Sequence, residues 1–266
     1  MTFSVALPQT GLQGWLFLSR TIDTQKHAYF ANGEAERNIL EFQEKISEVH
    51  TAEQLVADRE LLSVALTAFG LEDDIDNKFL IRKILNDGSS DPDALANRFS
   101  DKRYLAFTKA FGFGDFDVPR TQLSYFSEEI LSLYKDRQFE VSVGEQDQDM
   151  RLALSFGREM ENITETDKGE DTKWLEVLGN PPLKSIVERS MFLPDGFDSL
   201  DLDDQVALLK ERTEMQYGSS SVDVFRDQKN IDKMRTRFLL ATQLERYQYT
   251  NGASTALTLL QGGATA

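Results

Sequence analysis

Few residues in this sequence could do acid–base, thiol or metal chemistry. The chain contains no cysteine and two histidines, His27 and His50, and neither stands at metal-ligand spacing from a second histidine. This excludes thiol catalysis and cysteine-ligated zinc or iron–sulfur sites, and it argues against histidine-based triads. We therefore expect both histidines to be ordinary surface residues.

Carboxylates are plentiful, and two groups of them could be read as cation sites. The group Asp73, Asp74 and Asp76 lacks the following glycine and the distant glutamate of a calcium-binding loop. The densest group in the chain is Asp198, Asp201, Asp203 and Asp204. Helix capping explains this densest group, because aspartate oxygens accept hydrogen bonds from the exposed amides of a helix start. A bound cation is the alternative, and calcium titration would separate the two.

Glycine-rich loops that hold phosphates are missing as well. Gly112-Phe113-Gly114 has no third glycine in register and follows a predicted helix, so it does not match the dinucleotide-binding fingerprint. No Gly-Lys-Ser/Thr of the nucleotide-binding type is present. The sequence therefore nominates no catalytic, cofactor-binding or metal-binding residue, and we expect a protein that is not an enzyme and has no cofactor.

The charged residues are unevenly distributed along the chain. There are 29 Lys+Arg against 45 Asp+Glu, a net charge of −16, which argues against binding to nucleic acid or to anionic membranes. The first charged residue is Arg20 and the last is Arg246. The two neutral ends are either frayed and unpacked, or they form helices or docking segments in a larger assembly.

This charge distribution divides the 266 residues into three parts. Residues 1–19 form an uncharged N-terminal segment, disordered if frayed, residues 20–248 a helical body, and residues 249–266 an uncharged C-terminal tail. The body is expected to be one domain, with a weak boundary near the polar stretch 161–172. No basic region precedes Arg20, so no secretory signal is expected, and no apolar run is long enough to insert into a membrane.

Helical spacing of apolar residues dominates the body. The predicted fold class is therefore mainly α, a multi-helix bundle or an irregular helical array. Asp91-Pro92 is expected to start one helix, Ser221 is expected to cap a short one, and residues 230–248 are expected to form the last. The predicted helices end at glycines that suit a helix C-terminus: Gly70, Gly88, Gly112, Gly179 and Gly218.

Two short stretches depart from this simple helical pattern. Residues 139–143 alternate with strand period, so at most one short β element is expected there, and it could not form a stable sheet alone. Residues 68–71, Ala-Phe-Gly-Leu, resemble residues 110–113, Ala-Phe-Gly-Phe. This echo indicates either a helical repeat or two helices that end alike, and we favour the second.

Short stretches spread over residues 12–248 resemble, in order, a bacterial family, domain of unknown function 1217, often encoded among flagellar genes. The stretches are Asp58-Arg59, Ala68–Leu71, Ser100–Tyr104, Phe139–Gln146, Arg151–Leu154, Leu178–Leu183, Leu193-Pro194, Leu200–Asp203 and Arg237–Leu239. No single motif among them is specific. The resemblance implies a role associated with the flagellum, and it carries over no catalytic residue.

These considerations lead to one main hypothesis and two alternatives. The main hypothesis is a non-enzymatic, flagellum-associated protein with a structural or assembly role, bound to flagellar components and either cytoplasmic or exported with the flagellum. The first alternative is a cytoplasmic export chaperone or regulator, which would need an exposed apolar patch. The second is an enzyme acting on a small molecule without histidine or cysteine chemistry, which would need a pocket lined by buried charges.

Overall fold

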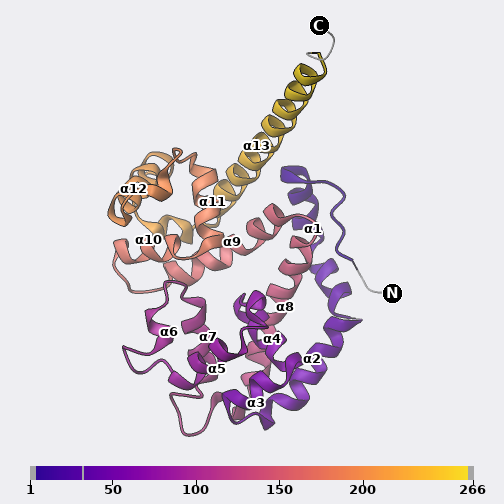
Figure 1. Ribbon diagram of the computed structural model, residues 1–266, viewed down its shortest axis with the longest axis vertical. Helices are drawn as coiled ribbons and strands as arrows, with labels where there is room; N and C mark the ends of the chain where they lie inside the picture. The colour runs from indigo at the N-terminus through magenta and orange to yellow at the C-terminus, as the bar shows by residue number, and fades with distance from the viewer. Residues whose placement is uncertain (1–3, 32, 263–266) are drawn as a thin grey trace. The chain divides into compact units, whose positions relative to one another are not determined.

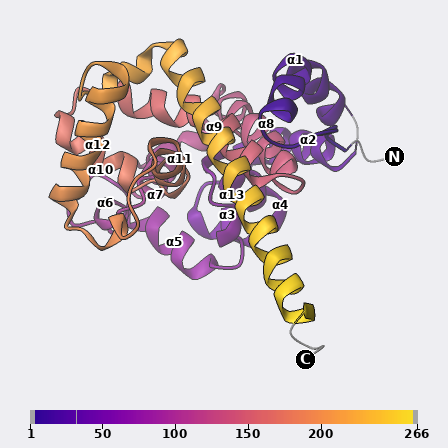
Figure 2. The ribbon, with the colours of Figure 1, turned by 90° about the horizontal axis from the view of Figure 1, so that it is seen from above.

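The chain folds into two compact units made of helices. The computed structural model describes residues 4–31 and 33–262, with side chains described as far as Tyr247, and every regular element in this part is a helix (Figure 1, Figure 2). Unit 1 consists of Leu18–Gln146 with the chain start up to Ala6, and unit 2 consists of Leu7–Phe17 and Asp147–Ala266. Helix α1, Gly11–Phe30, therefore contributes its first turns to unit 2 and the rest to unit 1.

In unit 1 the core is built around α4, which packs against α2, α3, α7 and α8. Nearly every residue of α4 from Leu61 to Ala68 is buried, as expected for a helix that is apolar on most sides. After α1, the helices of unit 1 are α2 Glu34–Lys45, η1 Ile46–Glu48, α3 Ala52–Ala57, α4 Arg59–Phe69, η2 Glu72–Asp74, α5 Lys78–Asp87, α6 Leu95–Arg98, α7 Arg103–Phe111, η3 Arg120–Gln122 and α8 Phe126–Gly144.

Local capping explains the echo between residues 68–71 and 110–113. Helix α4 ends at Gly70 and α7 at Gly112, and both glycines have the left-handed backbone of a helix C-cap, with φ of 71° and 68°. Glycine is favoured there because it has no Cβ to clash. The two helices end alike, with a phenylalanine in the last turn and glycine at the cap.

Two sequence patterns in unit 1 form other structure than the element they resemble. Residues 139–143 lie inside α8 and are not a strand; Phe139 and Val143 are buried at a spacing of four, and Glu140 between them is buried too. A five-residue alternation cannot outweigh a helix that is already packed against the core over its preceding turns. The helix expected at Asp91-Pro92 begins only at Leu95 and is four residues long, after a turn at residues 91–94.

Unit 2 is arranged around the last helix, α13, which packs against α9, α11 and η5. Its core includes the fully buried aromatic residues Phe156, Trp174 and Phe238. The helices of unit 2 are α9 Gln148–Thr164, α10 Glu170–Leu178, α11 Pro181–Met191, η4 Phe197–Ser199, α12 Leu202–Tyr217, η5 Val222–Arg226 and α13 Gln228–Gly262.

The division between the units lies at Gln146 and Asp147. The stretch 161–172, expected to hold a weak domain boundary, lies inside unit 2, where it forms the connection between α9 and α10. Of the neutral N-terminal segment, residues 11–19 belong to α1 and Val5 is buried, while residues 1–3 lie outside the described part.

The C-terminal helix is longer than the sequence predicts. Residues 230–248 were expected to be helical, but α13 continues to Gly262. Its last turns run on beyond the other helices of unit 2, as the yellow end of the ribbon shows (Figure 1). Residues 263–266 of the predicted tail lie outside the described part. Among the described helices, none combines the length and the apolar character needed to cross a membrane.

Candidate functional site

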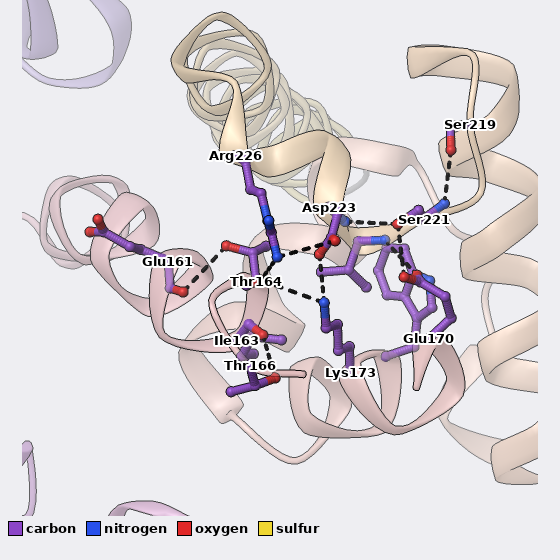
Figure 3. Close-up of polar contacts among 12 residues, drawn as sticks. Glu161, Ile163, Thr164, Thr166, Glu170, Lys173, Ser219, Ser221, Asp223 and Arg226 are labelled. Atoms are coloured by element: carbon purple, nitrogen blue, oxygen red, sulfur yellow. Dashed lines mark hydrogen bonds and ion pairs between the residues drawn. The ribbon is translucent and has the colours of Figure 1, made fainter. Parts of the chain in front are cut away.

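A buried ammonium group in unit 2 is the first candidate for chemistry (Figure 3). Lys173 lies on α10 and is 3% exposed, yet its Nζ atom is 2.7 Å from a carboxylate oxygen of Asp223 and 3.5 Å from the carbonyl oxygen of Thr164. Asp223 is also paired with Arg226 at 3.3 Å, and Arg226 donates a second hydrogen bond to the Thr164 carbonyl. A buried cation needs such partners, because burial without them costs several kcal/mol.

The start of α10 extends this polar network to the short helix η5. Glu170 accepts hydrogen bonds from the hydroxyl of Ser221 at 2.9 Å and from the backbone amide of Val222 at 3.1 Å. Ser221 in turn caps η5 by accepting from the amide of Asp223, as the sequence predicted for this serine. The indole of Trp174 donates to the Ser220 carbonyl at 3.1 Å.

These bonds tie three separate segments together. They join the end of α9 at Thr164, the start of α10 and the turn at residues 219–226, which are up to 62 positions apart in the chain. Because the lysine and the carboxylates bind one another and the backbone, the network fixes the α9–α10 connection. Its geometry is that of a structural network, with the Lys173 ammonium held by a carboxylate and not poised as a nucleophile.

A groove in unit 1 is the second candidate. It has a volume of about 700 Å³ and lies between the end of α1, α2 and α8. Its lining is mixed, with the apolar side chains Phe30 and Leu131 beside Lys26, His27 and Asp136. Lys26 is ion-paired with Asp136 at 2.7 Å, so part of the charge along the groove is already neutralised. His27 is exposed at this groove, and His50 is exposed elsewhere in unit 1.

The acidic cluster at residues 73–76 uses its carboxylates on its own chain. Asp74 accepts from the hydroxyl of Tyr104 at 2.6 Å and from Asn77, and Asp76 is paired with Arg59 at 2.9 Å. Partial burial, together with the hydrogen bond to Asp74, raises the pKa of Tyr104 to about 12. These contacts connect η2 and the residues after it to neighbouring helices, so the carboxylates of Asp74 and Asp76 already have partners within the chain.

The cluster at residues 198–204 is explained by capping only in part. Asp201 is the N-cap residue of α12, but its side chain accepts no capping hydrogen bond. Asp203 and Asp204 lie in the first turn, where a negative charge is stabilised by the helix dipole, and Asp198 is paired with Lys184 on α11. Over the described residues, no group of three or more His, Asp or Glu side chains is placed to hold a metal ion.

A third feature is an exposed apolar surface along α13 in unit 2. Phe192, at the end of α11, has a left-handed backbone with φ of 52°, which is strained for a residue with a large side chain. Phe192 is 56% exposed, and the guanidinium of Arg237 lies 5.7 Å from the centre of its ring. Leu240, Leu244 and Tyr247 follow on the same side of α13 at helical spacing and are about half exposed or more. We call Phe192, Leu240, Leu244 and Tyr247 the α13 patch.

Most of the chain matches a known protein family. The family model described as protein of unknown function (DUF1217) matches residues 68–231, which include most of both units. The chain belongs to this family. The family match agrees with the resemblance drawn from the sequence, and it assigns no reaction, ligand or partner. No curated protein matches the chain.

One solved structure shares the fold of this DUF1217 protein. The crystal structure of protein AGR_C_984 from Agrobacterium tumefaciens superposes with a TM-score of 0.72 at 24% sequence identity, over 88% of this chain and 93% of that one. At this identity the likeness extends to the fold. It supports the helical architecture described above over nearly the whole length of both chains.

Sequence reasoning missed the residues of the buried network. Lys173, Glu170 and Asp223 lie in polar stretches that resemble any solvated helix start, and Lys173 and Asp223 are 50 positions apart. One signal was available, since Ser221 was recognised as a helix cap and a cap fixes the direction of the following residues. The α13 patch was missed for a different reason: Leu240 and Leu244 fit the apolar pattern of any packed helix.

Proposed function

We propose that this DUF1217 protein is a non-enzymatic, flagellum-associated protein that acts in assembly by binding other proteins through its C-terminal helix. The observation that carries the proposal is the uncharged end of α13. The helix continues from Tyr247 to Gly262 without a charged residue, although the preceding part of the chain is densely charged. A long helix that leaves its own unit is a natural docking element for a partner helix.

The flagellar part of the proposal rests on the resemblance described above, because genes of this family often lie among flagellar genes. The chain's chemistry is compatible with an interaction role, since its buried charges are engaged in internal networks. An acidic, cysteine-free chain also suits export in an unfolded state, because no disulfide has to be opened on the way.

Fractionation of flagella tests the proposal directly. A tagged full-length chain is expected in sheared filaments or in hook–basal-body preparations, and deletion of its gene is expected to impair motility. A chain lacking residues 249–266 should remain folded but be lost from those fractions. A matched control lacking only residues 263–266 should behave as the full chain. Absence of the full-length protein from both fractions, with normal motility after deletion, would overturn the proposal.

The α13 patch favours a second candidate, a cytoplasmic export chaperone. Such a protein needs an exposed apolar surface for its substrate, and Phe192, Leu240, Leu244 and Tyr247 provide one on unit 2. The chaperone should recover one export substrate in a constant ratio when it is purified from cells. Leu244→Ser should reduce that recovery, whereas Glu214→Ser, a change on the exposed surface of α12, should not. Recovery of filament components only would favour the first candidate.

A further inference from the structure

The groove in unit 1 carries two charged groups that lack a counter-charge. Its α8 wall is lined by residues at helical spacing: Glu128, Leu131, Ser132, Lys135 and Asp136. Of the three charged residues on this wall, Asp136 is ion-paired with Lys26 of α1. Among the residues that the structure describes, Glu128 and Lys135 have no ion-pair partner, and both are exposed. The wall therefore offers one free carboxylate and one free ammonium group.

These two groups lie at opposite ends of the α8 wall. Lys135 follows Glu128 by seven positions, which is two helical turns, or about 10 Å at 1.5 Å per residue. The ion pair of Lys26 with Asp136 lies beside Lys135 and adds no net charge, so this end of the wall is positive and the Glu128 end is negative. A ligand that pairs with both groups carries an ammonium group and a carboxylate about 10 Å apart.

The lining between the two charged ends is apolar. Leu131 lies between Glu128 and Lys135 on α8 and is 2% exposed, and Phe30, the last residue of α1, packs against the core of unit 1. They offer an aliphatic and an aromatic surface to the middle of a ligand. Three further lining side chains can form hydrogen bonds with amide groups: His27, Gln43 and Ser132. A short peptide has this order of groups, with charged ends, amides and an apolar side chain between them.

The size of the groove favours a small ligand over a protein partner. From Glu128 to Asp136 the α8 wall is about 12 Å long, little more than two helical turns. The volume of about 700 Å³ lies in the range of small-molecule sites. A stable protein interface covers about 800 Å² on each partner, which is more than so short a wall provides. An extended peptide of three residues spans about 10–11 Å and matches the separation of the two free charges.

We propose that the groove binds a short peptide of about three residues with free ends, its ammonium group at Glu128, its carboxylate at Lys135 and an apolar central side chain against Leu131 and Phe30. Both charged residues are exposed, so each ion pair raises the affinity by at most about fivefold. The binding is therefore weak, and its selectivity for free peptide ends is its distinguishing property. The site uses no residue of α13 and does not depend on the proposed function.

The first test locates the site by NMR titration of the isotope-labelled full-length chain with the tripeptide Ala-Leu-Ala, which has free ends and an apolar centre. Saturable shift changes are expected for the backbone amides of residues 26–31 and 128–136, which contain most of the groove lining. The rest of the spectrum should stay unchanged and reports that the chain remains folded. No shift change at millimolar tripeptide, or changes confined to residues outside the groove, would overturn the proposal.

The second test assigns the two ends with forms of the tripeptide that lack one charge. The natural chain should bind the free tripeptide about two- to fivefold more tightly than the C-amidated or the N-acetylated form. Lys135→Gln should bind the free and amidated forms alike and still discriminate against the acetylated form, and Glu128→Gln should show the reverse. Lys109→Gln removes an exposed charge of α7 outside the groove and should keep both preferences. Equal affinity of the natural chain for all three forms, or loss of both preferences in one groove variant, would overturn the assignment.

Discussion

The two neutral ends of the chain look alike in sequence and differ in structure. Near the N-terminus, the first turns of α1 are held closely against unit 2. A Cβ atom on Gly14 would collide with the carbonyl oxygen of Gln9 and would lie 2.8 Å from Met150 of α9. The ring of Trp15 lies 4.5 Å from the guanidinium of Arg235 on α13. At the other end, the uncharged turns of α13 continue beyond the helices of their unit.

Absence of charge can arise for two structural reasons. A neutral segment can be neutral because it is packed on its own chain, where charges would be costly to bury. It can also be neutral because it is to be packed on another chain. Composition does not separate these cases, and only the presence of close contacts within the unit does.

The largest effect on stability is expected in α1, at the residue where the neutral N-terminal segment passes into unit 1. Leu18 is completely buried, so Leu18→Ala should lower the free energy of unfolding by about 2–5 kcal/mol through lost burial and the cavity left behind. Leu16, two positions earlier, is 42% exposed, and Leu16→Ala should change it by less than about 0.5 kcal/mol. Chemical denaturation followed by circular dichroism measures both. Equal losses for the two variants would contradict the packing described for this segment.

An intermediate effect on stability is expected at Arg246, which pairs with Asp147 and Asp149 at the start of α9. Partial burial tends to lower the pKa of Arg246, but its hydrogen bond to Asp147 and the charges of Asp149 and Asp147 raise it overall. Arg246→Met would leave two largely buried carboxylates short of a partner, at a cost of about 1–3 kcal/mol.

Arg189 is also ion-paired with Asp149, at 3.2 Å. The loss of stability expected for Arg246→Met is therefore smaller than if both Asp147 and Asp149 were left without any cationic partner. Arg246→Lys retains the charge without the planar fork and should lose less. Thermal unfolding of the two variants measures the difference. If Arg246→Met melts like the natural chain, the last anchor of α13 lies elsewhere.

The fold was predictable where local backbone chemistry decides it. The helix ends at Gly70, Gly112 and Gly218 were recognised because a left-handed cap favours glycine whatever surrounds it. The strand-like pattern at residues 139–143 and the helix end expected at Gln248 were misleading for the opposite reason. Burial of residues along α8 outweighs a strand pattern of five residues, and the helical backbone of α13 continues to Gly262, past the end that the sequence indicates.

The candidate sites were less predictable than the fold. The pairing of Lys173 with Asp223 joins residues 50 positions apart, and the groove beside His27 is built from three helices of unit 1. Such neighbours follow from tertiary packing, which spacing along the chain does not encode. The acidic clusters show the converse: they were visible in sequence, but Asp74 and Asp198 are engaged with Tyr104 and Lys184.

A smaller effect is expected where the N-terminal segment touches α13. Arg235 is 9% exposed, and burial lowers its pKa, so its contact with the Trp15 ring takes place largely out of water. Trp15→Leu should cost about 0.5–2 kcal/mol through the lost cation–π contact. Arg235 would keep its hydrogen bonds to the Ala153 carbonyl and to Asp232. Trp15→Phe, which retains a ring, should cost less, and denaturant titration ranks the two.

The smallest effect on stability is expected for the C-terminal end of α13. Removal of residues 249–266 should change the free energy of unfolding by less than about 0.5 kcal/mol, which corresponds to a shift of roughly 2 °C or less in the melting midpoint. The reason is that the C-terminal end of α13 runs on beyond the other helices of unit 2 (Figure 1), so its loss should leave the core of that unit intact. Differential scanning calorimetry of the natural and shortened chains measures the shift. A fall of several degrees would mean that this end packs on its own chain, as α1 does, and that the contrast between the two neutral ends does not hold.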